Sequence, residues 1–379
     1  MALPEVHLVA GTCSEAVKLA PVVLAMRSAG LLTPVLVAVD ERIAQTLTAF
    51  DLAPDVTLTA SVETDPPAEL ISQLDELWAG RPPAAVIVQG DTMTSLAGAL
   101  AGSWRRIPVV HLEAGLRSGD LNPAFPEEAN RRLVAQLTAL HLAPTPLAAM
   151  NLLDENIATG DVLITGSTAV DATLAVAGRR LPFENVVLER ARTDRRLVLV
   201  LVQSSTAPLL PITILIGKYP DIEVVLTGTE TAGLDRVTIT EPLSYPDRSR
   251  LLSEAYLVLT DSGDILAEAP SFGVPALVLG ESTEWVESLH AGCAKLVGSD
   301  TDLIVREASA LLDSRLRRDA MAAVGNPYGD GLAAARTAQA TAALLGLAER
   351  PEPMPSTQAP TVNQSAPVTF GRAPWVSKK

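Results

Sequence analysis

The sequence predicts an α/β protein made of two domains, each with a doubly wound parallel sheet. Short apolar runs alternate with longer segments in which apolar residues recur three and four positions apart, the pattern of strands joined by crossover helices. A length of 379 residues is too great for one ordinary domain and suits two domains with sizeable cores. In doubly wound sheets ligands bind beyond the carboxyl ends of the strands, so we expect the ligand in the cleft between the domains.

Nine apolar runs have the length and composition of buried strands. They cover residues 6–10, 35–39, 85–88, 109–112, 162–165, 197–202, 223–226, 256–260 and 276–279. The first group ends near Gly166 and the second begins near Arg195, with a helical segment at 171–178 and then a stretch containing Pro and Arg between them. We therefore predict a linker there, with one domain at 1–174 and a second at 175–331.

The sequence changes character after Leu347. Residues 348–379 combine many prolines with small polar residues and show almost no periodicity, which is typical of segments that bury too little apolar surface to fold. Trp375 could anchor this segment to a partner, but chain ends of this composition are most often unstructured. We expect a disordered tail.

Composition excludes several classes of partner. A net charge of −15 disfavours binding to nucleic acid or to anionic lipid, although a local basic pocket for a phosphorylated small molecule is compatible with it. No apolar run reaches the roughly 18 residues that span a bilayer, and no secretory signal is evident at the start, so we expect a cytoplasmic protein. Cys13 and Cys293 are far apart in the sequence and predict two unpaired thiols and no metal site.

The turn after the first expected strand has the arrangement of an anion site. Residues 11–15 connect this strand to a helix that carries Lys18 one turn inside. A strand–turn–helix junction directs backbone N–H groups and the positive end of the helix dipole at a ligand, and the lysine can reach the same charge. No glycine fingerprint accompanies the turn, so an ordinary turn with a surface lysine remains the alternative.

Carboxylates stand at the expected carboxyl ends of two further strands. Asp91 follows one of these strands and Glu113 follows the next, while Glu127 and Glu128 lie in the first turn of a later helix. Acidic residues in a first helical turn commonly compensate the helix dipole, and we assign Glu128 to this purpose. Charged groups that face the ligand crevice are suited to proton transfer, so Asp91, Glu113 and Glu127 are the candidate acids and bases.

Six sequence blocks resemble the signature blocks of bacterial non-hydrolysing UDP-N-acetylglucosamine 2-epimerases and occur in that family's order. They read QGDTMTS, HLEAGLRSGD, PEEANRRL, ITGSTAVDA, LTDSGDILAEAPSFGVP and NPYGDG. The resemblance is close over approximately residues 5–174 and 251–347 and poor over 175–250. It implies a glycosyltransferase-B-like pair of Rossmann-like domains with a UDP-sugar in the cleft, a helix at 332–347 that crosses back to the first domain, a homodimer and no cofactor.

In that family UDP is eliminated from the sugar with loss of the C2 proton. UDP then adds back to the 2-acetamidoglucal with C2 inverted, which interconverts UDP-GlcNAc and UDP-ManNAc. Carboxylates must shuttle the proton, and cationic or N–H groups must hold the leaving diphosphate. By motif, the resemblance implies catalytic roles for Asp91, Glu113 and Glu127 and binding roles for Lys18, Arg131, Ser262, Gly263, Glu268 and Gln203. Of these, Ser262 and Gly263 match diphosphate positions, and Glu268 matches the carboxylate that accepts from both ribose hydroxyls.

The departures from the family pattern gather on the nucleotide side. The family's Gly-Thr-Arg-Pro-Glu turn has Cys13 for the arginine and Ser14 for the proline, so a guanidinium that would hold the diphosphate is absent. Gln203 replaces an active-site histidine, Asp264 replaces the second glycine of a Ser-Gly-Gly turn, and Trp285 replaces an arginine. The segment at 227–229 lacks the family's histidine, which weakens the expectation of regulatory binding of a second UDP-sugar.

Functions of different classes fit this pattern. The three retained carboxylates favour an active epimerase, because solvated surface charge does not account for them. The missing histidine and arginines favour a catalytically silent UDP-sugar binder or scaffold. A third alternative is a hydrolysing 2-epimerase that releases ManNAc when water attacks a retained intermediate. A divergent copy of this kind suits specialised metabolism, such as an amino-sugar antibiotic route, better than a cell-wall role.

Overall fold

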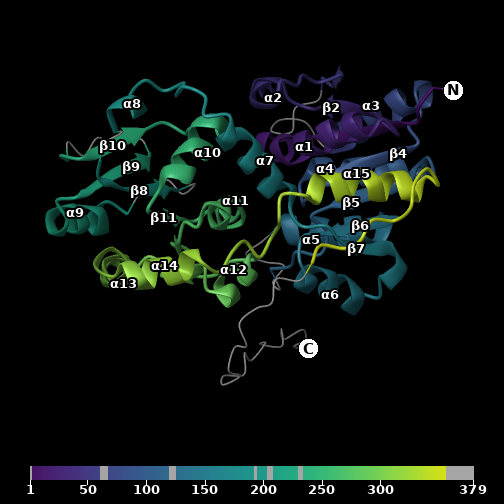
Figure 1. The fold of residues 1–379 in the computed structure, drawn as a ribbon. Helices are drawn as coiled ribbons and strands as arrows, with labels where there is room; N and C mark the ends of the chain where they lie inside the picture. The colour runs from purple at the N-terminus through teal and green to yellow at the C-terminus, as the bar shows by residue number, and fades with distance from the viewer. Residues whose placement is uncertain are drawn as a thin grey trace, which may run out of the picture.

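The chain forms two parallel sheets, each flanked by helices, that lie side by side in Figure 1. The computed structural model describes residues 2–59, 67–118, 125–191, 194–202, 208–228 and 234–355. The predicted class, α/β with two parallel-sheet domains, is confirmed. Within these residues no helix is both long enough and apolar enough to cross a bilayer.

The first sheet has seven parallel strands in the order β3-β2-β1-β4-β5-β6-β7. Its strands are β1 (Glu5–Ala10), β2 (Thr33–Ala38), β3 (Val56–Thr57), β4 (Ala85–Gln89), β5 (Val109–Leu112), β6 (Leu140–Ala143) and β7 (Val162–Ile164). The connections contain α1 (Cys13–Ala29), α2 (Arg42–Leu47), η1 (Thr48–Phe50), α3 (Pro67–Gly80), α4 (Met93–Trp104), α5 (Glu127–Leu137), α6 (Pro146–Asp154) and η2 (Thr159–Asp161), and α7 (Thr168–Gly178) follows β7. The order reverses between β1 and β4, which is where doubly wound sheets bind ligands.

The second sheet repeats this topology with six parallel strands in the order β10-β9-β8-β11-β12-β13. Its strands are β8 (Arg196–Leu201), β9 (Ile222–Thr227), β10 (Val237–Thr240), β11 (Leu257–Thr260), β12 (Ala276–Val278) and β13 (Ala294–Leu296). Its helices are α8 (Leu188–Ala191), α9 (Leu209–Lys218), α10 (Tyr245–Glu254), α11 (Gly263–Glu268), η3 (Ala269–Phe272), α12 (Val286–Ala291), α13 (Thr301–Asp313) and α14 (Arg315–Ala322). Here the order reverses between β8 and β11.

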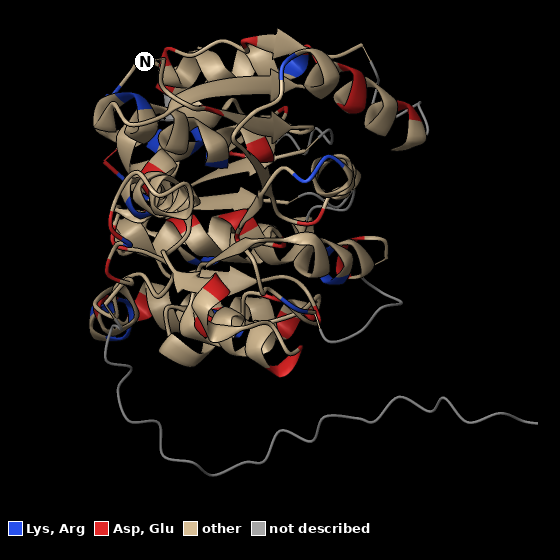
Figure 2. Ribbon diagram, turned by 90° about the vertical axis from the view of Figure 1, so that its right-hand side faces the viewer, with Lys and Arg blue, Asp and Glu red and all other residues tan. Residues whose placement is uncertain are grey.

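All nine predicted strands are present, with ends that differ by a residue or two. Four further strands, β3, β6, β10 and β13, were not predicted. Figure 2 shows why the predicted ones stood out, because charged residues lie mostly on helices and loops while the interior strands are largely uncharged. Parallel strands covered on both faces need apolar residues at nearly every position.

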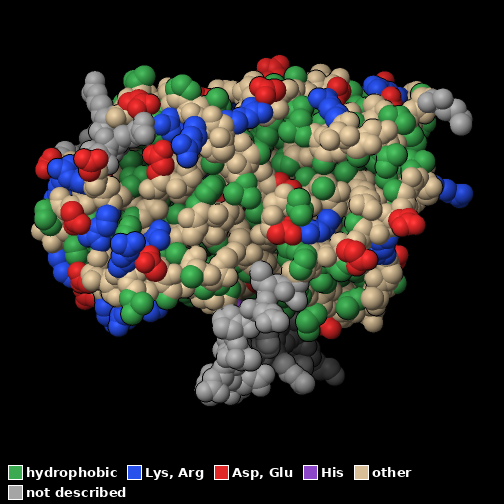
Figure 3. All heavy atoms as spheres, in the orientation of Figure 1, with side chains coloured by type: hydrophobic (Ala, Val, Ile, Leu, Met, Phe, Trp, Pro, Cys, Tyr) green, Lys and Arg blue, Asp and Glu red, His purple; other side chains and the backbone are tan. Residues whose placement is uncertain are grey.

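Apolar cores cover the faces of each sheet, and one of these cores contains residues from both sheets. One buried cluster joins Ala143 and Val170, from the first sheet and its helix α7, to Leu199 and Val258 of the second sheet. Tyr328 belongs to this cluster and is fully buried. On the face shown in Figure 3 acidic and basic side chains are interspersed, so the net charge of −15 does not form one acidic patch there.

The last helix of the described chain, α15 (Ala333–Leu344), packs against α1 and α7 of the first sheet (Figure 1). Its amino end is capped from α7, where the Asp171 carboxylate accepts from the backbone N–H groups of Ala333 at 3.3 Å and Ala334 at 2.9 Å. Because α7 directly follows β7, this cap ties α15 to the first sheet.

The chain after α15 differs from the expected disordered tail at 348–379. Residues up to 355 lie against β7, where the Met354 N–H donates to the Ile164 carbonyl at 2.7 Å and Arg350 donates to the carbonyl of Val162 at 2.6 Å. Pro351 and Met354 are buried, which supplies the apolar burial that the composition did not suggest. The remainder of the tail, including Trp375, lies outside the described residues.

Candidate active site

Two adjoining cavities open where the carboxyl ends of the strands of both sheets face each other. The larger, of about 700 Å³, is bounded by α1 and α2 on one side and by residues 242–246, α10 and α11 on the other. The smaller, of about 230 Å³, lies over the ends of β4 and β5. Three residues line both cavities, namely Ser14, Lys18 and Asp264. Together the cavities have the size of a site for an elongated small molecule.

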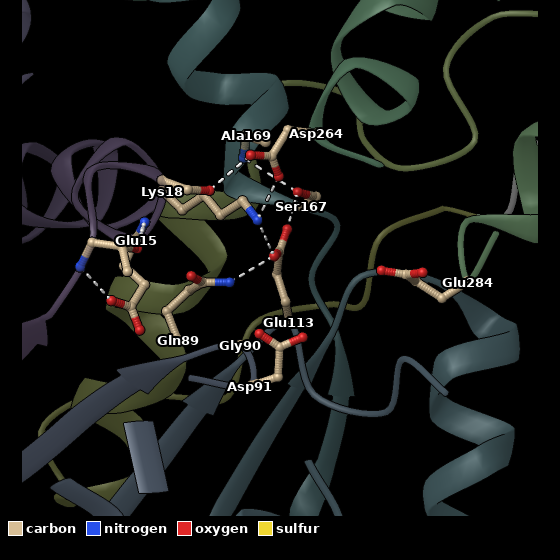
Figure 4. A network of polar contacts seen from close by, with 12 residues as sticks. Glu15, Lys18, Gln89, Gly90, Asp91, Glu113, Ser167, Ala169, Asp264 and Glu284 are labelled. Atoms are coloured by element: carbon tan, nitrogen blue, oxygen red, sulfur yellow. Dashed lines mark hydrogen bonds and ion pairs between the residues drawn. The ribbon is translucent and has the colours of Figure 1, made fainter. Parts of the chain in front are cut away.

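Glu113 is held at the carboxyl end of β5 by groups from three other elements. Its backbone has φ 60, a left-handed conformation that is uncommon outside glycine and is often found at functional sites. Figure 4 shows three side chains pointing toward its carboxylate. Gln89 donates to Oε2 at 2.7 Å, Lys18 pairs with Oε2 at 2.9 Å, and the Ser167 hydroxyl donates to Oε1. A buried carboxylate is thus fixed in one orientation beside the smaller cavity.

Lys18 is buried, which rules out the alternative of a surface lysine. Its Nζ atom lies 2.9 Å from Oε2 of Glu113 and 2.9 Å from Oδ1 of Asp264. Burial alone would lower the pKa of Lys18, but the charges of Asp264 and Glu113 outweigh burial and hold this pKa well above its ordinary value. The cavities therefore share a permanently charged ammonium group.

Asp264, which replaces a glycine of the family pattern, lines both cavities. Its Oδ2 accepts a hydrogen bond of 2.8 Å from the Ser14 hydroxyl. Its Oδ1 pairs with Lys18, and both of these side chains are labelled in Figure 4. Burial would raise the pKa of Asp264, but Lys18 and Arg248 lower it to about 2. The residue is accordingly ionised, and it links α11 of the second sheet to α1 of the first.

The turn at residues 11–15 serves a different purpose from the one predicted. The Glu15 carboxylate accepts from the N–H groups of Gly11 and Thr12, both at 2.7 Å, so these two donors are not directed at a ligand. The same carboxylate accepts from the hydroxyls of Thr92 at 2.6 Å and Ser95 at 3.0 Å. Glu15 therefore fixes the turn after β1 against the start of α4, and Lys18 remains the cationic group that this segment presents to the cavities.

Arg131 brings three acidic residues together on the other side of the smaller cavity. It pairs with Asp91, with Glu284 at 3.5 Å and with Glu128 at 3.6 Å. Glu128 stands in the first turn of α5, as predicted, but it is also fully buried and accepts from the backbone N–H of Ser118 at 3.0 Å, so it has a structural role beyond compensation of the helix dipole. Glu127, one residue earlier, is exposed and does not line either cavity.

The start of α11 forms the wall of the smaller cavity that belongs to the second sheet. Ser262 and Gly263 line this wall next to Trp285. A Cβ atom at Gly263 would lie 2.1 Å from Nε1 of Trp285, so only glycine fits beneath the indole ring. The ring stands 5.9 Å from Nζ of Lys18 and packs edge-on against Tyr328 at a centroid distance of 4.9 Å.

Tyr328 connects the two sheets through three hydrogen bonds close to this wall. Its hydroxyl donates to the Trp285 carbonyl at 2.8 Å and accepts from the Ser288 N–H at 2.9 Å. Its own carbonyl accepts from the N–H of Ser167, the residue that holds Glu113, at 2.7 Å. The NPYGDG block therefore has a structural role that joins α12 to the end of β7.

Glu268 lines the larger cavity, and one of its two carboxylate oxygens has no partner among the described residues. Its Oε1 accepts from Arg248 at 2.8 Å and from Tyr245 at 3.5 Å, while its buried Oε2 has no hydrogen-bond partner among the described residues. Burial raises the pKa of Glu268 to about 7, although Arg248 acts in the opposite direction. An unpartnered buried acceptor is costly, and a hydroxyl donor from a ligand would satisfy it.

The structure brings most of the predicted site residues together. Those that line the smaller cavity are Lys18, Asp91, Glu113, Arg131, Ser262 and Gly263, and Glu268 lines the larger one. Glu127 lies apart from them, and Gln203 falls outside the described residues. Sequence analysis did not assign Gln89, Ser167 or Arg248. The first two could have been found, since Gln89 ends β4 and Ser167 comes soon after β7, each within a block that carries the family resemblance.

The structure offers no evident metal centre. Among the residues it describes, no three or more His, Cys, Asp and Glu side chains are grouped so that they could hold a metal ion. Cys13 is exposed at the larger cavity and Cys293 is buried, and both are free thiols.

Comparisons with known proteins agree with this geometry. The family model for UDP-N-acetylglucosamine 2-epimerase matches residues 39–342. A probable UDP-N-acetylglucosamine 2-epimerase from Ralstonia solanacearum is 35% identical over 370 residues, covering 89% of this chain and 98% of the relative. The UDP-N-acetylglucosamine 2-epimerase of Bacillus subtilis is 35% identical over 356 residues, covering 88% of this chain and 93% of the relative.

Solved structures show the same likeness in three dimensions. An S. aureus MnaA–UDP co-structure superposes with a TM-score of 0.85 at 32% identity, covering 93% of this chain and 100% of that one. A Neisseria meningitidis UDP-GlcNAc 2-epimerase bound to UDP-GlcNAc gives a TM-score of 0.77 at 33% identity, covering 87% of this chain and 97% of that one. This chain belongs to the UDP-N-acetylglucosamine 2-epimerase family.

Proposed function

We propose that this chain is a UDP-N-acetylglucosamine 2-epimerase that interconverts UDP-GlcNAc and UDP-ManNAc. The observation that carries the proposal is the placement of Glu113, a buried carboxylate held by Lys18, Gln89 and Ser167 beside a cavity large enough for a sugar ring. The similar proteins from S. aureus and Neisseria meningitidis, which were solved with UDP and UDP-GlcNAc, support the same ligand class.

The two cavities suggest how a UDP-sugar would lie. The nucleoside would occupy the larger cavity, where the free Oε2 of Glu268 can accept from a ribose hydroxyl. The sugar would occupy the smaller cavity with Asp91 and Glu113. The diphosphate would then cross the junction of the cavities beside Lys18, Ser262 and Gly263, where a cation stabilises the leaving group.

Epimerisation in this site would proceed by elimination and re-addition. A carboxylate takes the C2 proton, the electron pair of the C2–H bond forms a C1–C2 double bond, and the C1–O bond breaks with its electrons passing to UDP. Re-addition runs these steps in reverse, with the proton delivered to the opposite face of C2. The positions of Glu113 and Asp91 beside the smaller cavity support their roles in the two proton transfers, and the resemblance adds Glu127. No cofactor is required, because carbon is neither oxidised nor reduced overall.

A second function, a catalytically silent UDP-sugar binder, is favoured by one observation. Asp264 already binds the ammonium group of Lys18 and the hydroxyl of Ser14, which a diphosphate would need as donors. This is expected to weaken the binding of the leaving diphosphate. Against this alternative, Glu113 keeps three polar partners that orient it, which a binding protein would not need.

Incubation with UDP-GlcNAc in D₂O, followed by proton NMR at C2, separates these functions. An epimerase must exchange the C2 proton with solvent and form UDP-ManNAc, and we expect both. Binding of UDP-GlcNAc without exchange would identify a silent binder. Release of free ManNAc together with UDP would identify a hydrolysing enzyme. The homodimer that the resemblance implies can be measured on the same samples by sedimentation.

A further inference from the structure

Asp264 occupies the point at which the two cavities meet. Its carboxylate lies 2.9 Å from Nζ of Lys18 and accepts from the Ser14 hydroxyl at 2.8 Å, and all three residues line both cavities. A ligand long enough to fill both cavities must therefore pass over this contact. Ser14 and Lys18 belong to α1 whereas Asp264 belongs to α11, so the contact also bridges the two sheets.

The contact takes up donors that an anionic ligand would require. An ammonium group has three N–H donors, and two of those on Lys18 are directed at Glu113 and Asp264. The Ser14 hydroxyl donates its single proton to Asp264. A phosphate placed at the junction would lie against the ionised carboxylate of Asp264. Two negative charges in contact in a buried site repel each other strongly. A diphosphate and the Asp264 carboxylate thus exclude each other.

We propose that Asp264 is an internal competitor for the phosphate position, and that its carboxylate must leave Lys18 and Ser14 before a diphosphate can bind there. The ligand's identity as a UDP-sugar rests on the proposed function, but the competition applies to any diphosphate. Ser14 and Asp264 are both departures from the family pattern, which has proline and glycine at these positions. Because proline has no hydroxyl and glycine has no carboxylate, the contact depends on both substitutions. Asp264 thereby sets how tightly this chain holds the phosphate part of its ligand.

Calorimetric titration of the full-length chain with pyrophosphate, UDP and uridine tests this proposal. Asp264→Asn keeps the side-chain shape and removes the charge, and Asp264→Ser is a second variant in case the first one folds poorly. Both should bind pyrophosphate and UDP at least about tenfold more tightly than the wild type, with uridine affinity unchanged within about twofold. Glu241→Gln is the matched control, because it removes an exposed carboxylate from the loop beside the larger cavity and should leave all three affinities unchanged.

The three probes separate the competitor from the proposed function. Unchanged affinity for pyrophosphate and UDP in the folded Asp264 variants would overturn the proposal that Asp264 competes with phosphate. Equal tightening of uridine would also overturn it, because the effect would then be a general change in the cleft. Tightening of pyrophosphate together with no binding of UDP or uridine to any variant would support the competitor and reject the proposed UDP-sugar function.

Discussion

The Nζ atom of Lys18 lies 2.9 Å from Oε2 of Glu113, and both side chains are buried. A buried charge is stable only when it is paired, so each of these residues fixes the position and the charge of the other. The pair places a cation next to a carboxylate at the end of β5, where a leaving anion and a proton would both have to be handled. Substitutions that keep the shape of the carboxylate are therefore the informative ones.

The first prediction concerns the three candidate carboxylates. Asp91→Asn, Glu113→Gln and Glu127→Gln should each lower turnover by at least ~100-fold, because an amide cannot accept a proton near neutrality. The C2 exchange assay measures this effect, and the exposed Glu241→Gln serves as a control. The Glu127 variant is the most discriminating, since this side chain lies away from both cavities. A wild-type rate in any one variant removes that residue from the mechanism.

A second prediction concerns Gln203, which replaces the family's histidine. If the carboxylates alone transfer the proton, Gln203→His should change the exchange rate only modestly, by less than about tenfold. A protein silenced by this replacement would behave differently. It would show no exchange as the wild type and would become active in Gln203→His, or in Gln203→His combined with Cys13→Arg. That result would reject the proposed epimerase activity of the natural chain.

Binding of the nucleoside should depend on pH through Glu268. Its pKa is raised to about 7 by burial, so the carboxyl is mostly protonated below pH 7 and ionised above it. The ionised form accepts from ribose hydroxyls more strongly, because hydrogen bonds to a charged acceptor are stronger than those to a neutral one. Uridine affinity should therefore increase by at least about threefold between pH 6 and pH 8. Titrations of Glu268→Gln should show weaker binding without this increase, and a pH profile identical to that of the wild type would contradict the assignment.

A fourth prediction tests the cap on α15. Asp171→Ala removes the acceptor for the N–H groups of Ala333 and Ala334 and should lower the free energy of unfolding by about 1–2 kcal/mol. Asp171→Asn keeps one acceptor oxygen and should cost less. Urea denaturation of both variants beside the wild type gives these values. Equal stability of all three proteins would show that the helix does not depend on this cap.

How far the fold could be predicted depended on where each strand lies. The nine predicted strands are apolar runs buried in the sheets. Of the strands that were not predicted, β3 has only two residues and lies at an edge of the first sheet. The strand β10 lies at an edge of the second sheet and has threonine at every second position. In β6 the run is broken by His141, whose buried ring lies against the Ala135 and Asp161 carbonyls and can donate its single N–H to one of them. In β13 it is broken by Lys295, which reaches Glu307. Local apolar content cannot reveal strands whose polar residues find partners elsewhere.

For the site too, the features that depend on local sequence could be predicted, and those that depend on contacts between distant residues could not. Asp91 and Glu113 were predictable because the ends of parallel strands converge. Whether Glu127 or Glu128 faces inward depends on the rotation of α5, which two adjacent glutamates do not specify. The Ser14–Asp264 hydrogen bond joins residues 250 positions apart, and only the relative placement of the two sheets brings them together.

The bonds of Tyr328 have a mechanical consequence for the cleft. Since this buried residue is bonded both to Ser167 and to α12, it fixes the end of β7 to the second half of the molecule at this point. Ser167 and the Glu113 carboxylate that it holds are therefore tied to both halves of the molecule. The alignment of this candidate proton-transferring group thus depends on the second half of the molecule as well as on the first.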